Sequence, residues 1–109
     1  KFTAVHGDIT SPKRFNYILE KGSLLKKNFD EMTVPVLFVG HTHYPIVFIR
    51  DENGNIKCIS EKAGGNIHLD ILNNRYIINV GSIGQPRDGS TDGCCVLFDD
   101  CNLDLEYIQ

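Results

Sequence analysis

Three of the four histidines in this 109-residue chain stand where side chains could bind a metal ion. His41 and His43 follow the apolar run 36–39 and Gly40, and His6 follows another short apolar segment near the N-terminus. A run of this length is too short for a helix and suits a strand buried on both faces. Glycine then lets the backbone turn where the strand ends. Because imidazole is the commonest metal ligand near neutral pH, this pattern predicts a metal site at the strand end.

The placement of the histidines decides between this interpretation and a simpler one. An isolated histidine after a strand is usually a hydrogen-bonded loop residue, and a His-x-His pair alone is a weak signal. If the two strands are parallel neighbours, however, they lie about 4.8 Å apart and end at the same sheet edge. His6 and His41 then project into one crevice, where His43 can reach a second position. Asp8 either orients a histidine or closes a turn, and we favour the turn; His68 is predicted to be structural.

The elements that must position these histidines change character along the chain. Residues 2–5 and 34–39 are predicted strands, and between them we expect one helix starting at Ser11 and a second capped by Ser23. This order predicts an α/β fold, in which a parallel pair with a helical crossover is continued by antiparallel strands. We expect a sheet layer or two-sheet sandwich with helices outside, incomplete on its N-terminal side. The further strands are expected at 46–50, 55–60, 67–71, 76–80, 94–98 and 103–108, with a hairpin turn at 51–54 and a loop at 81–92.

Composition narrows the class of protein. The length allows one domain at most, or part of one, and the net charge of −3 provides no basic face for nucleic acid. No apolar stretch approaches a membrane span and no signal peptide is visible, although we expect the true start to lie upstream of Lys1. We interpret Cys58, Cys94, Cys95 and Cys101 as small buried hydrophobic residues in a reducing cytosol, with a disulfide or thiol–metal role as the alternative. The chain is therefore expected to be cytoplasmic.

The segments that carry the histidines also resemble known motifs. Val-His-Gly over residues 5–7 and Gly-His-Thr-His over residues 40–43 resemble the last two metal-binding motifs of the calcineurin-like metallophosphoesterases. The loop that reads Asn-Val-Gly-Ser-Ile-Gly-Gln-Pro-Arg-Asp-Gly over residues 79–89 is similar to a loop of one branch of that superfamily. That branch contains small bacterial and archaeal phosphodiesterases and proteins called diadenosine-tetraphosphatase-like. The resemblance spans nearly the whole chain.

By this resemblance, His6 and His41 ligate one of two metal ions, and His43 ligates the other. The remaining ligands of the family come from three earlier motifs, Asp-x-His, Gly-Asp and Gly-Asn-His, as does its auxiliary catalytic histidine. This chain lacks all three, so residues 1–109 resemble the C-terminal portion of a single metallophosphoesterase domain. The whole domain of that family is a four-layer αββα sandwich. We expect the segment alone to be inactive and unstable, because half of the sheet and core would be missing.

The resemblance implies a hydrolase. In the complete domain, two divalent transition metals would activate a hydroxide that attacks a phosphate ester, as in a phosphodiesterase or phosphatase. Mixed histidine, carboxylate and amide ligands suit such metals better than calcium, and we expect manganese ahead of iron, zinc or nickel. The expected partner is a small-molecule phosphate ester rather than a membrane or a nucleic acid. A second copy of the chain could pair with exposed edge strands.

The loop after residue 80 offers candidate contacts to substrate. Backbone amides near Gly81 and Ser82 could face the site, and Asn79 could support the turn that carries the histidine pair. Arg87 could meet a substrate phosphate, because guanidinium matches phosphate oxygens. Alternatively, Arg87 and Asp88 pair with each other or with the frame in a rigid turn.

A non-catalytic scaffold is the alternative function, as in the retromer subunit that has the same fold. Three intact histidines favour catalysis, because a scaffold has no need for all of them. A regulatory module that binds metal without turnover is a third hypothesis. The sequence upstream of Lys1 discriminates these hypotheses, since an enzyme should carry the three earlier motifs there.

Overall fold

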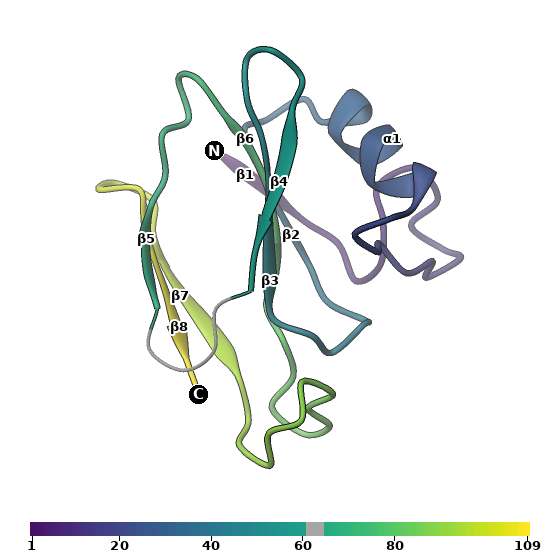
Figure 1. The fold of residues 1–109 in the computed structure, drawn as a ribbon, viewed down its shortest axis with the longest axis vertical. Coiled ribbons are helices and arrows are strands. Elements are labelled where there is room, and N and C mark those ends of the chain that lie inside the picture. Colours follow the sequence, from purple (N-terminus) through teal and green to yellow (C-terminus); the bar gives the residue numbers. More distant parts are fainter. Residues whose placement is uncertain (61–64) are drawn as a thin grey trace.

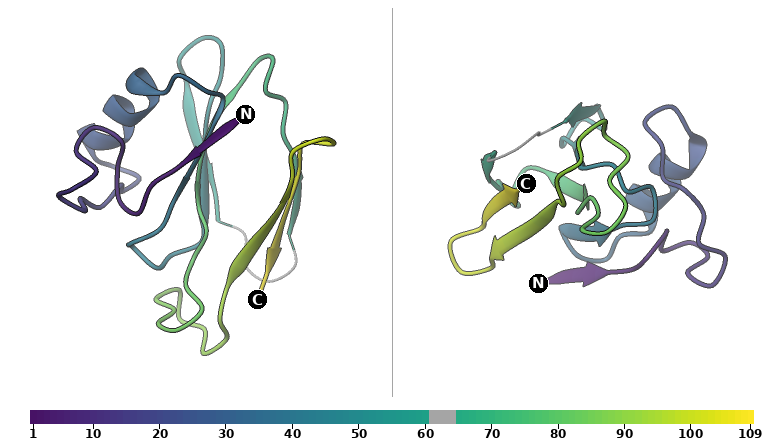
Figure 2. Two further views of the ribbon diagram at one scale, coloured as in Figure 1. Left: turned by 180° about the vertical axis from the view of Figure 1, so that it is seen from behind. Right: turned by 90° about the horizontal axis from the view of Figure 1, so that it is seen from below.

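The computed structural model describes residues 1–60 and 65–109, which form two sheets and one helix (Figure 1). The smaller sheet lies against one face of the larger sheet, and the helix covers the other face, as both views in Figure 2 show. The described residues therefore make three layers, in the order helix, sheet, sheet. The predicted mixed α/β fold is confirmed, with one helical layer in this part of the chain. No helix among the described residues is long and apolar enough to cross a membrane.

The larger sheet positions the histidines. Its strand order is β1-β2-β6-β3-β4. β1, β2 and β6 run parallel to one another, whereas β3 is antiparallel to both β6 and β4. The predicted parallel pair, the helical crossover between its strands and the hairpin at 51–54 are confirmed. The strands are β1 (Phe2–Ala4), β2 (Val36–Val39), β3 (Ile46–Arg50), β4 (Ile56–Ile59) and β6 (Arg75–Asn79).

The smaller sheet is antiparallel, with the order β5-β8-β7. It contains β5 (Asn66–His68), β7 (Cys95–Asp99) and β8 (Asp104–Ile108), so β5 is shorter than the strand expected at 67–71. Strand β8 alternates between exposed and buried residues, which directs Leu105 and Tyr107 toward the larger sheet. Between the sheets these two side chains pack with Val36, Val47, Ile49, Tyr76 and Ile78.

Helix α1 (Ser23–Glu31) buries one side against the opposite face of the larger sheet. Leu25 and Phe29 lie four residues apart on one helix face and pack with Leu37, Phe48 and Ile77. Consecutive residues of a strand point to opposite faces, so the continuous apolar runs of β2 and β6 serve both cores at once.

The helix expected to start at Ser11 is absent, and the chain from residue 9 to residue 22 is irregular. Phe15 adopts φ 52°, in the left-handed region, which interrupts any right-handed helix there. The amides of Thr10 and Ser11 donate to the Asp8 carboxylate at 2.9 and 3.0 Å, so the predicted turn role of Asp8 is confirmed. The second helix exists, but Gly22 is its N-cap and Ser23 is its first residue, contrary to the expected cap.

The four cysteines are free, and their burial differs. Cys94 is buried as expected, whereas Cys58 and Cys95 are partly exposed and Cys101 is exposed. The interpretation of all four as buried hydrophobic residues is therefore wrong for Cys101, which lies in the turn between β7 and β8.

Candidate metal centre

The ends of β1 and β2 bring His6 and His41 together. The ladder between the strands continues past their ends, because Val5 N donates to Phe38 O at 3.0 Å and Gly40 N donates to His6 O at 2.9 Å. His6 Nε2 then lies 2.9 Å from His41 Nδ1. Two imidazole nitrogens bound at about 2.0–2.1 Å to neighbouring positions of one ion lie about 3 Å apart. The pair therefore fits the first coordination sphere of a single transition metal.

The turn that carries His41 and His43 is held in an unusual conformation. Both residues have left-handed backbone angles, with φ 66° at His41 and φ 61° at His43. A non-glycine residue in that region costs about 1–2 kcal/mol, so neighbouring contacts must hold the turn. Thr42 N donates to Gly40 O at 2.8 Å and closes the turn internally.

Asn79, at the end of the third parallel strand β6, supports the turn from beneath. Its side chain is 1% exposed, and its amide nitrogen donates to Gly40 O at 2.8 Å and to Thr42 Oγ1 at 2.7 Å. The amide oxygen accepts from Gly81 N at 3.1 Å. One buried amide thus joins the histidine turn to the loop that follows β6.

That loop also fixes the ring of His43. His43 Nδ1 lies 2.9 Å from Gln85 O, and Arg87 N donates to His43 O at 3.2 Å. Since a carbonyl only accepts, the Nδ1 atom carries the proton and Nε2 keeps its lone pair for a metal. Ser82 shapes the same loop, because its hydroxyl accepts from Gln85 N at 3.0 Å. The structure therefore brings Asn79, Gly81, Ser82 and the backbone of Arg87 to the histidine turn.

The surroundings of His41 favour the neutral form of its ring. Desolvation of the ring lowers its pKa, and the neighbouring charges of His6, His43 and Arg87 lower that pKa further, against a backbone hydrogen bond at Phe15. A neutral imidazole has a free lone pair, which a metal ligand requires. The Arg87 side chain is exposed, whereas Asp88 is buried and accepts from Ser90 N at 3.0 Å and Gln109 Nε2 at 2.8 Å.

Two aromatic residues that sequence reasoning missed lie against the histidine pair. The Tyr17 ring stacks on the His41 ring, with centroids 4.3 Å apart and planes 15° apart. The Phe15 ring meets His6 edge-on at 5.4 Å between centroids. The helical spacing of Phe15 and Ile18 had predicted that Phe15 lies on one face of a helix. No pattern in the sequence indicated Tyr17. These rings come from the irregular segment where that helix was expected.

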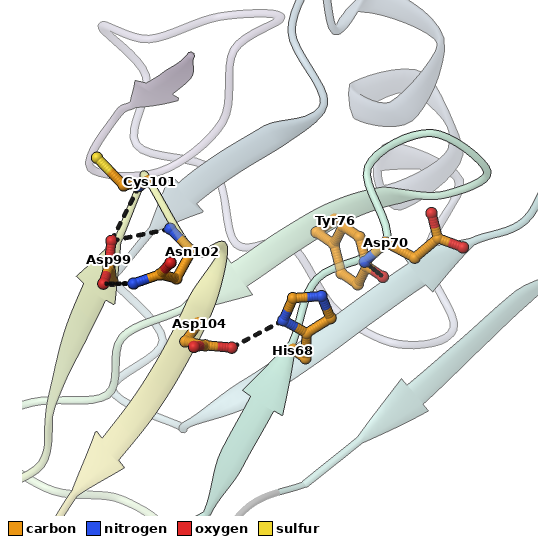
Figure 3. A network of polar contacts seen from close by, with 7 residues as sticks. All are labelled: His68, Asp70, Tyr76, Asp99, Cys101, Asn102 and Asp104. Carbon is orange, nitrogen blue, oxygen red and sulfur yellow. Dashed lines mark hydrogen bonds and ion pairs between the residues drawn. The ribbon is translucent and has the colours of Figure 1, made fainter.

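A second cluster of potential ligands is explained as a turn (Figure 3). Among residues 1–60 and 65–109, the one set of three such groups within 4.8 Å of one another is Asp99, Asp100 and Cys101. Asp99 accepts from Cys101 N at 2.9 Å and from Asn102 N at 3.0 Å, which closes the exposed turn between β7 and β8. His6, His41 and His43 do not form such a set among the described residues. His68 pairs with Asp104 at 2.8 Å on the exposed side of the smaller sheet.

Comparisons with known proteins give a curated relative and a structural neighbour. No family model matches the sequence. The chain is 39% identical over 74 residues to the uncharacterized protein MJ0912 of Methanocaldococcus jannaschii, a match that covers 68% of this chain and 28% of that protein. It also matches the crystal structure of a metallophosphoesterase from Sphaerobacter thermophilus at a TM-score of 0.81 and 30% identity, over 98% of this chain and 44% of that one. The chain thus spans less than half of either protein. Its fold and its histidine motifs together place it in the calcineurin-like metallophosphoesterase superfamily.

Proposed function

We propose that the protein carrying this segment hydrolyses phosphate esters at a centre of two divalent metals. The single observation that supports the proposal best is the 2.9 Å approach of His6 Nε2 and His41 Nδ1 at the ends of two parallel strands. A bare pair of histidines needs no left-handed turn, no buried amide beneath it and no neighbouring loop that orients a third imidazole. These features together are what a preorganised ligand set requires.

The described residues would have different roles at such a centre. His6 and His41 would hold one ion and His43 Nε2 the other, with the remaining ligands supplied from outside residues 1–109. Bound divalent metals lower the pKa of water and neutralise charge on a phosphate during attack. Asn79 keeps the histidine turn in its left-handed form, and the lowered pKa of His41 keeps that ring available as a ligand. Arg87, exposed beside His41, would bind the phosphate oxygens of the substrate.

The finer assignments belong to the same proposal. We take manganese as the first candidate metal, a small phosphodiester or phosphomonoester as substrate, and the cytoplasm as the location. Residues 1–109 would be the C-terminal portion of one domain, inactive without the preceding portion.

The test is hydrolysis of bis-p-nitrophenyl phosphate by the full-length protein with manganese. We expect turnover in the wild-type protein and a rate of hydrolysis that is lower by about 100-fold or more in His41→Ala. Removal of a residue that only orients a metal ligand already costs activity, and removal of the ligand itself costs at least as much. His68→Ala is the matched control, since His68 is exposed and pairs with Asp104 in the smaller sheet. Absence of turnover with manganese, nickel and zinc in folded protein would favour the scaffold function instead.

A further inference from the structure

The segment after β1 brings two aromatic rings to the histidine pair. Tyr17 lies flat on His41 at 4.3 Å, and Phe15 meets both histidines, with centroids 5.4 Å from His6 and 6.2 Å from His41. Neither ring is a potential metal ligand in the set derived above. Their position at the site therefore needs another explanation.

Within the part of the chain that the structure describes, these rings lie outside the two hydrophobic cores. Phe15 is 50% exposed and Tyr17 is 47% exposed, whereas Ile18 in the same segment is 4% exposed and packs beneath α1. The segment thus has its own anchor and holds the two rings outward beside the histidines. A ring that is half exposed offers an open surface to a ligand.

The backbone conformation of the segment holds Phe15 beside the histidines. Phe15 holds φ 52°, a left-handed angle that is unfavourable for a bulky side chain. The backbone at Phe15 passes so close to Gly7 that a Cβ added to Gly7 would lie 2.9 Å from Phe15 Cα. Asp8 binds the amides of Thr10 and Ser11. The close approach at Gly7 and the buried carboxylate of Asp8 therefore fix where Phe15 lies.

We propose that Phe15 and Tyr17 form an aromatic platform that stacks on a flat aromatic group of the substrate, so that the site selects aryl-bearing phosphate esters over aliphatic ones. The inference rests on the proposed function, because the histidine centre would hold the phosphate while the platform holds the ring. Aromatic pairs prefer offset-stacked and edge-to-face arrangements, and a puckered aliphatic ring of equal size cannot reproduce these electrostatics. The platform therefore separates substrates by planarity and not by hydrophobic area.

The test measures binding of phosphonates, which cannot be hydrolysed at the carbon–phosphorus bond. Phenylphosphonate and 2-phenylethylphosphonate are each compared with the cyclohexyl counterpart by calorimetry on manganese-loaded full-length protein. The two spacers allow for the distance between the histidines and the platform. We expect the aryl member of at least one pair to bind about fivefold more tightly.

Variants locate the source of that preference. Tyr17→Leu should reduce the aryl preference to about onefold while leaving the cyclohexyl affinity nearly unchanged, and Tyr17→Phe should retain the preference. Phe15→Leu provides a second measurement if Tyr17→Leu does not fold. Leu19→Ala is the matched control, because Leu19 is 58% exposed in the same segment.

The outcomes separate this inference from the proposed function. Equal affinities for aryl and cyclohexyl probes in the wild-type protein, a preference that survives both leucine variants, or no binding of any probe would overturn the platform. Turnover of a phosphodiester without an aryl preference would leave the hydrolase proposal intact and remove the platform. An aryl preference that depends on Tyr17, in a protein without turnover, would support the platform and reject hydrolysis.

Discussion

Two loops leave the same edge of the larger sheet, and they are held in different ways. The loop after β2 is a tight turn at residues 40–43, held by Asn79 from a neighbouring strand. The loop after β1 runs from residue 5 to residue 22 and is held by its own Asp8 and by Asn28 of α1, whose side-chain oxygen accepts from Ile9 N at 2.9 Å. The short turn presents His41 and His43 and is held from outside by Asn79 and by the loop that follows β6. The long loop presents His6 and the two aromatic rings and is held by Asp8 and Asn28.

Removal of Asn79 should break the short turn and have the largest effect. Asn79→Ala deletes three hydrogen bonds at a side chain that is 1% exposed and leaves Gly81 N without that acceptor. We expect a loss of about 3 kcal/mol in the free energy of unfolding of the full-length protein. Hydrolysis should fall as well, because His41 and His43 would leave their left-handed conformation. Chemical denaturation and the manganese-dependent assay measure the two effects.

Asn66→Ala is the control for this prediction. Asn66 is exposed in β5 of the smaller sheet, so its variant should keep both stability and activity. If Asn79→Ala retained full activity, the turn would hold its form without the buried amide, and its support would have to come from the loop at Gln85.

The same comparison shows what the sequence could predict. The parallel pair and the meeting of His6 with His41 followed from apolar runs and the residues directly after them, because these signals are local. The place of β6 as a third parallel strand beside β2 was not predicted. The loop after β1 was predicted as a helix, since Phe15, Ile18 and Leu19 have helical spacing. Its actual path depends on Asn28, nineteen residues from Ile9, and on backbone contact at Gly7, which no local pattern encodes. The aromatic half of the site was missed for this reason.

Alanine at Gly7 and at Gly40 sharpens the comparison between the loops. The sequence indicated Gly40 as the residue at which the backbone turns. A Cβ added at Gly40, however, meets only His6 O, at 3.7 Å, which is ordinary van der Waals contact. A Cβ at Gly7 would lie 2.9 Å from Phe15 Cα and 3.0 Å from Asn16 O, both backbone atoms. We expect Gly7→Ala to lower the free energy of unfolding by about 2 kcal/mol, and Gly40→Ala to change it by less than about 1 kcal/mol. Thermal denaturation of the two variants measures the difference.

If Gly40→Ala lowered the free energy of unfolding more than Gly7→Ala, the long loop would have to shift to accept a side chain at Gly7. In that case Phe15 would not be fixed in place, and the Gly7→Ala protein should keep its stability while losing any preference for aryl phosphonates. Gly84→Ala is a neutral reference for both variants, because a Cβ at Gly84 meets nothing within 4 Å.

Loss of the Asp8 charge should have the smallest effect on the free energy of unfolding, and this effect should depend on pH. Burial would raise the pKa of Asp8, but hydrogen bonds from Thr10, Ser11 and Asn16 outweigh burial and hold that pKa below its usual value. A carboxyl whose pKa is lowered in the folded protein stabilises it above the unfolded pKa of about 3.9 and loses this contribution as the pH falls through the folded value. Asp8→Asn should therefore cost about 1 kcal/mol at neutral pH and progressively less below pH 4.

Denaturation of metal-free full-length protein from neutral to acid pH measures this effect without interference from metal release. The wild-type and Asp8→Asn curves should converge at low pH, because a protonated Asp8 and an asparagine both lack the charge that the Thr10 and Ser11 amides bind. Glu52→Gln, at an exposed position of the hairpin turn, is the control that removes a carboxylate outside the long loop. A constant difference between wild type and Asp8→Asn at every pH would show that the shape of the Asp8 side chain, and not its charge, holds the long loop beside the histidines.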